Sequence, residues 1–107
     1  MEATLRLVCL PAAGEAATMA AVHGELTDGE LIERSAAGDR DAFDELYRRF
    51  ARAVLGLALR RLGDRGRAED VVQEAFAAIW RSAGSYRRER GTGAAWLYAI
   101  VLNAIVD

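Results

Sequence analysis

The stretch AEDVVQEAFAAIW, from Ala68 to Trp80, decides the fold of this 107-residue chain because its residues fall on two chemically different helix faces. One face of the helix is polar and carries Glu69, Asp70, Gln73 and Glu74, with no lysine or arginine before Arg81. The spacing therefore predicts a core-facing stripe and an acidic outer face that suits an arginine-rich partner. The stripe recurs at i, i+3, i+4 and i+7 and consists of Ala68, Val71, Val72, Ala75, Phe76, Ile79 and Trp80.

The composition indicates one all-α domain. The chain is 52% hydrophobic, contains a single proline and is rich in alanine, leucine and arginine, which favour helices. Its length excludes a second full domain. We expect no sheet.

The charge distribution is more informative than the formal net charge of −2. Residues 25–45 carry eight acidic residues against Arg34 and Arg40, whereas residues 48–67 carry seven arginines against Asp64. This split predicts distinct acidic and basic surfaces on one small domain.

The residue inventory does not predict an enzyme, a cofactor or a metal site. Cys9 and His23 are the only residues of their kinds, so neither an internal disulfide nor a zinc ligand set can form. The sequence contains no nucleophile–base set and no glycine-rich phosphate loop. The N-terminus lacks a signal peptide pattern, and the apolar run Ala94–Val106 is too short to span a bilayer. We expect a cytoplasmic protein that does not insert into membranes.

Capping residues and glycines divide the chain into four helices after a poorly ordered leader, residues 1–24. The first helix begins at Thr27 or Asp28, carries Leu31, Ile32 and Ala36 toward the core, and ends at Gly38. The second begins at Asp39 or Asp41 and ends at Gly63, with an apolar stripe of Phe43, Leu46, Tyr47, Phe50, Val54, Leu57, Ala58 and Leu62.

The last two helices are separated by an arginine-rich loop. Asp64 caps the third helix, which runs to about Ser82 before Gly84 breaks it, and Thr92 caps the fourth, from Gly93 to the end. Short connections favour antiparallel packing of the second and third helices, with the other two crossing them. The predicted fold is a compact orthogonal four-helix cluster.

Three ordered motifs resemble region 2 of extracytoplasmic-function (ECF) sigma factors of the sigma-70 family, across residues 28–107. They are DAFDELYRRFARAV from Asp41, AEDVVQEAFAAIW from Ala68 and YRRERGTGAAWLYAIVLN from Tyr86. The resemblance implies a bacterial transcription initiation factor that docks on the β′ clamp helices of RNA polymerase and reads and melts the promoter minus-ten element. It also implies that the linker and the minus-35-binding domain would follow Asp107, so that the chain is truncated before them.

By this resemblance Asp70, Gln73 and Glu74 match the positions that contact β′. Carboxylates there can accept charge-assisted hydrogen bonds from arginines, and Gln73 can both donate and accept. The alternative is a charged helix face that is merely solvated. An anti-sigma protein is a further expected partner, because many relatives have their polymerase-binding faces covered by one.

The third motif resembles the promoter-melting segment of the family. Arginines neutralise phosphates and aromatic rings stack on exposed bases, so the combination suits single-stranded DNA, with a flipped base held between the loop and the fourth helix. Tyr98 is the candidate for stacking, Asn103 can read a base edge, and Trp96 is assigned to the core. The predicted DNA-binding residues are Arg87, Arg88, Arg90, Tyr98 and Asn103.

Two alternatives remain at this point. Ala94, Ala99, Leu102 and Ala104 occupy positions that are often basic in the family, which allows a protein-interaction module that binds polymerase or an anti-sigma protein and has lost DNA recognition. The other alternative is self-association through the apolar fourth helix, in which only Tyr98 and Asn103 are polar.

Overall fold

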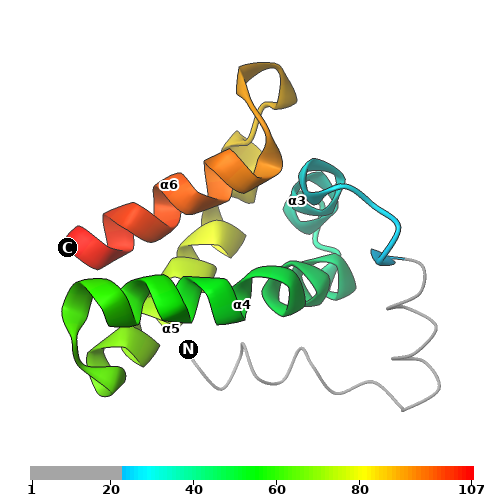
Figure 1. Cartoon of the computed structure of the whole chain (residues 1–107). Coiled ribbons are helices and arrows are strands. Elements are labelled where there is room, and N and C mark those ends of the chain that lie inside the picture. The colour runs from blue at the N-terminus through cyan, green and yellow to red at the C-terminus, as the bar shows by residue number, and fades with distance from the viewer. Residues whose placement is uncertain (1–22) are drawn as a thin grey trace, which may run out of the picture.

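The computed structural model describes residues 23–107, and this range contains four α-helices and no strand (Figure 1). The all-α prediction is confirmed, whereas most of the predicted leader, residues 1–22, lies outside the described residues. The helices are α3 (Asp28–Ala36), α4 (Arg40–Leu62), α5 (Arg65–Ser82) and α6 (Gly93–Val106).

Each helix begins at a side-chain cap. Thr27 caps α3 in a capping box with Glu30, and Asp39 caps α4 by accepting from the backbone amides at positions 41 and 42. Asp64 and Thr92 cap α5 and α6 in the same way. Such a cap stabilises a helix by about 1 kcal/mol. The local signals for helix starts therefore operate as predicted.

The ends of α4 and α5 differ in kind. Gly63 adopts the left-handed conformation at φ 69° and leaves only itself and Asp64 to connect the two helices. The predicted end of the third helix near Ser82 is confirmed, and Gly84 lies just beyond it, inside a 3₁₀ turn, η1 (Ala83–Ser85). Ala83, the first residue of this turn, keeps helical dihedrals and is buried against the core.

The core gathers around the predicted stripe of α5. Phe76 and Ile79 are fully buried, and the Phe76 ring meets Phe43 edge-on at a centroid distance of 6.2 Å. Leu97 and Val101 of α6 close the core from the other side. The division of α5 into a buried stripe and an exposed polar face is confirmed.

Two stripe predictions are wrong. Ala36 is exposed, because α3 ends there, and Ser35 is buried instead with its hydroxyl donating to the Leu31 carbonyl at 2.9 Å. Tyr47 is 44% exposed, although its ring still contacts Phe76 edge-on at 4.8 Å. Tyr47 therefore lies at the rim of the core.

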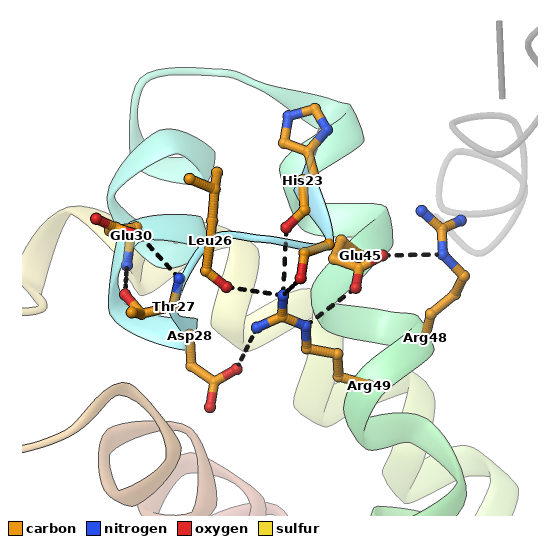
Figure 2. A network of polar contacts seen from close by, with 9 residues as sticks. His23, Leu26, Thr27, Asp28, Glu30, Glu45, Arg48 and Arg49 are labelled. Carbon is orange, nitrogen blue, oxygen red and sulfur yellow. Dashed lines mark hydrogen bonds and ion pairs between the residues drawn. The ribbon is translucent and has the colours of Figure 1, made fainter. Parts of the chain in front are cut away.

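In space, α5 folds back behind α4, α6 crosses both, and α3 packs at one end of α4 (Figure 1). The chain before α3 is fastened to α4 by Arg49, whose guanidinium faces that segment in Figure 2. Its Nη2 donates to the carbonyls of His23 (3.2 Å), Gly24 (3.1 Å) and Leu26 (2.7 Å), and its Nη1 donates to Asp28 (2.8 Å). Residues 23 and 24, the end of the predicted leader, are therefore bound to the domain.

Candidate functional site

The outer face of α5 presents Asp70 and Gln73 to solvent. The carboxylates on either side of them are paired within the helix, Glu69 with Arg65 at 2.9 Å and Glu74 with Arg81 at 3.3 Å. Both pairs are exposed, so water screens them and a partner could displace them.

Asp70 and Gln73 differ from these neighbours. Within residues 23–107, neither side chain makes a hydrogen bond or an ion pair. A carboxylate can accept several hydrogen bonds, and an amide can both donate and accept. Asp70 and Gln73 are therefore open to an arginine-bearing partner, whereas Glu74 must first release Arg81 before it can bind an arginine of the partner.

A groove of about 410 Å³ lies beside this face, between α4 and α5. Its lining combines apolar side chains with one arginine and one glutamate. It is lined by Tyr47, Ala51, Arg52 and Leu55 of α4 and by Glu69, Val72 and Gln73 of α5. Gln73 thus belongs both to the acidic face and to the groove.

Sequence reasoning missed the α4 side of this groove. Tyr47, Ala51 and Leu55 recur at intervals of four and share a helix face, but only Tyr47 belongs to the predicted stripe of this helix. The partial exposure of Tyr47 is what identifies this face of α4 as the wall of a groove and not as part of the core.

The loop between α5 and α6 is anchored by Tyr86. This side chain is 7% exposed, its hydroxyl donates to the Gly91 carbonyl at 3.2 Å, and its ring meets Trp96 edge-on at 5.7 Å. Residues between these anchors form a second 3₁₀ turn, η2 (Arg88–Arg90). One buried aromatic residue thus ties both ends of the loop to the start of α6.

A cavity of about 240 Å³ opens where the loop meets α6. Two arginines and two aromatic residues are among those that line it, a combination that suits a flat ring held next to a phosphate. The lining residues are Ser85, Tyr86, Arg87, Arg90, Gly91, Thr92, Ala95 and Trp96. The expected pocket between the loop and the last helix is therefore present.

Of the five predicted DNA-binding residues, the structure brings only Arg87 and Arg90 to this cavity. Tyr98 is half-buried, with its ring edge-on to Phe50 of α4 at 5.8 Å, and Asn103 is exposed farther along α6. Neither lines the cavity.

Arg88 faces another element. Its Nε and Nη2 donate to the two carboxylate oxygens of Glu33 in α3, at 2.9 Å and 2.5 Å. The hydrogen bond from Arg88 holds the pKa of Glu33 below its ordinary value, and the same contact raises the pKa of Arg88.

Trp96, which is predicted to lie in the core, is half-buried: it packs against the core and also lines the cavity. Its position explains the difference, since it lies in the first turn after the Thr92 cap and next to the loop. Proximity to a helix start flanked by arginines was the signal that could have placed it in the site.

No helix in residues 23–107 combines the length and the apolar character that crossing a membrane requires. Of the large apolar residues of α6, Leu97 and Val101 are fully buried in the domain, whereas Leu102 and Val106 are exposed.

Comparison with known proteins agrees with these features. The family model for Sigma-70 region 2 matches residues 46–107, more than half of the chain. The RNA polymerase sigma-H factor of Pseudomonas aeruginosa is 40% identical over 76 residues, which cover 71% of this chain and 39% of that protein. The ECF RNA polymerase sigma factor SigM of Mycobacterium tuberculosis is 40% identical over 83 residues, covering 78% of this chain and 42% of that protein.

The chain spans about two-fifths of the length of these curated relatives. The matched segment includes most of α4, all of α5 and α6, and the loop between them. It thus contains the acidic face and the cavity. The chain belongs to the sigma-70 region 2 family.

Proposed function

We propose that this chain is the polymerase-docking and promoter-melting domain of a transcription initiation factor. In this role it binds the β′ clamp helices of RNA polymerase, recognises and opens the minus-ten element, and catalyses no reaction itself. The observation that carries the proposal is the outer face of α5, where Asp70 and Gln73 are exposed and unpartnered within residues 23–107 beside the α4–α5 groove. The relatives' names, all RNA polymerase sigma factors, support the same assignment.

Docking would use charge and shape together. An arginine of β′ can donate to Asp70, and another can displace Arg81 from Glu74 because that pair is exposed. An apolar side chain of the partner fits the groove between Leu55 and Val72. Contacts that are buried on docking supply most of the affinity at such an interface.

Promoter melting would use the loop and α6. Arg87 and Arg90 can hold backbone phosphates while a base leaves the duplex and enters the cavity against the aromatic wall. Asn103 is exposed on α6 and can read a base edge. Tyr98 contributes to stacking only through the part of its ring that Phe50 leaves open.

The proposal places the protein in the cytoplasm and includes an anti-sigma protein as a regulator. Such a regulator would compete with β′ for the α5 face. Self-association through α6 is not proposed, because the comparisons favour a sigma factor and the helix buries Leu97 and Val101 within its own domain. Loss of DNA recognition is not favoured either, since the arginine-lined cavity is present.

The test is binding of the full chain to core RNA polymerase, measured by fluorescence anisotropy. Asp70→Ala and Gln73→Ala should each weaken binding by about 1–3 kcal/mol while the domain stays folded. Asn103→Ala is the matched control, since it removes an exposed amide from a different helix. Equal affinity for all three variants and the wild type would refute the docking face.

A further inference from the structure

Arg88 differs from the other arginines of its loop in having a partner on a distant helix. Glu33 of α3 lies 55 positions earlier in the sequence and accepts two parallel hydrogen bonds from Arg88. Arg87 instead donates to the carbonyls of Gly84 and Tyr86 in its own loop. Among residues 23–107, no other side-chain hydrogen bond or ion pair links residues 87–90 to another element.

This pair is open to solvent. The side chains of Arg88 and Glu33 are 60% and 43% exposed, respectively. Water and salt weaken such a pair, so Arg88 can leave Glu33 at low cost when another anion is near. A phosphate group offers the same two-oxygen geometry that the carboxylate offers, and guanidinium groups bind both in this way.

The loop does not depend on the pair for its shape. Tyr86 is buried, contacts Trp96 and donates to the Gly91 carbonyl, so both ends of the loop are held without Glu33. The cavity is lined by Arg87 and Arg90 but not by Arg88. Because the pair between Arg88 and Glu33 shapes neither the loop nor the cavity, Arg88 can exchange Glu33 for another anion without disturbing either.

We propose that Glu33 competes with DNA phosphate groups for Arg88, and so lowers the affinity of the loop for single-stranded DNA. The inference rests on the proposed function, since it concerns how the same loop binds the promoter. Glu33 occupies Arg88 in the free domain, and a phosphate takes its place in the complex. Glu30 also lies near Arg88 on α3 and adds to the negative charge that incoming DNA meets.

The test is a double-mutant cycle on the full chain. Anisotropy of a short fluorescein-labelled single-stranded oligonucleotide of mixed sequence reports affinity at low and at moderate salt. Glu33→Gln should bind about two- to five-fold more tightly than the wild type, the range that an exposed ion pair of ordinary strength supplies. In the Arg88→Gln background, Glu33→Gln should give a clearly smaller gain, because the competed group is gone.

Glu89→Gln is the matched control. Glu89 lies in the same loop as Arg88, and its carboxylate has no ion pair within residues 23–107. The variant therefore measures the general effect of one less negative charge near the DNA. The gain from Glu33→Gln should exceed the gain from Glu89→Gln. Both positions are exposed, and circular dichroism would verify that each variant is folded.

Three results would overturn the inference. Equal gains from Glu33→Gln with and without Arg88 would show that no competition exists, and weaker binding by Glu33→Gln would show that the pair positions the loop. After either of these two results, the proposed function would still hold if DNA binding were weakened by substitution of Arg87 or Arg90. No binding by the wild type even at low salt would overturn the inference together with promoter recognition.

Discussion

Gly93, the first residue of α6, lies directly against Gly29 in the first turn of α3. A Cβ at Gly93 would stand 2.6 Å from the Gly29 nitrogen and 2.8 Å from the Asp28 carbonyl carbon. Both atoms belong to the backbone, so neither can rotate away. The close approach of two glycines is what lets the start of α6, and with it the loop and the cavity, rest on α3.

Gly93→Ala should therefore destabilise the domain. Alanine is favoured over glycine in helices by about 1 kcal/mol, but overpacking against backbone costs about 1–3 kcal/mol and should prevail. Urea denaturation followed by circular dichroism would measure the change. Gly56→Ala is the control, since its Cβ would meet only the Arg60 side chain at 3.7 Å and should leave stability unchanged or raised. A Gly93→Ala variant as stable as Gly56→Ala would contradict the packing described here.

Arg49→Lys should destabilise the domain although the charge is kept. Lysine lacks the planar fork that reaches Asp28 and the carbonyls of residues 23, 24 and 26 at once. We expect a loss of about 1–3 kcal/mol in the free energy of unfolding, together with faster amide hydrogen exchange before α3.

Arg48 provides the matched comparison for this prediction. It is the neighbouring arginine, and it makes one exposed contact, to Glu45 at 3.2 Å. Arg48→Lys should change stability by no more than about 0.5 kcal/mol. Similar losses in the two variants would mean that the segment before α3 does not depend on the Arg49 fork.

The helix starts could be predicted from sequence because caps are local. Thr27, Asp64 and Thr92 each bond to an amide three residues later, so the signal lies within one turn. The two faces of α5 could be predicted for a similar reason, since the helical period places Phe76 and Glu74 on opposite sides without reference to any other helix.

Features that depend on how helices cross could not be predicted in this way. The pair between Glu33 and Arg88 exists only because the end of α3 lies beside the loop, and no period relates two residues 55 positions apart. Tyr47 and Trp96 were assigned to the core because apolar spacing does not distinguish a core position from the wall of a groove or cavity. Both side chains lie at the rim of the core, where the packing of neighbouring helices determines how much of each ring is exposed.

The stability of the domain should fall in acid through Asp39. Burial acts to raise the pKa of this carboxyl, but hydrogen bonds from the Ala42 amide and from His23 outweigh it, so the pKa lies below its ordinary value. A depressed pKa means that the stabilisation is complete above the ordinary pKa and is lost as the pH falls through the lower, folded-state value.

Asp39→Asn tests this prediction because asparagine also caps helices but does not titrate in this range. Urea denaturation at a series of pH values from about 6 to about 2 would give the free energy of unfolding of both proteins. The wild type should lose more stability than Asp39→Asn below about pH 4. Parallel curves would show that Asp39 does not carry this part of the acid sensitivity.

The arginines that line the cavity lead to a prediction about the salt dependence of DNA binding. Arg87 and Arg90 line the cavity, so each should neutralise about one phosphate of a bound single strand. Removing one phosphate contact from a single strand flattens the slope of log K against log salt by about 0.7. Arg87→Gln and Arg90→Gln should each show this change when the full chain is titrated with a labelled oligonucleotide.

Arg61→Gln is the control for this measurement. It removes the same charge from the exposed last turn of α4, at the opposite end of the domain from the loop in Figure 1. Its slope should match that of the wild type, because a single strand held at the cavity does not reach that turn. If Arg61→Gln flattened the slope as much as Arg87→Gln did, the domain would bind DNA through its overall charge, and the cavity would have no special part in capturing the strand.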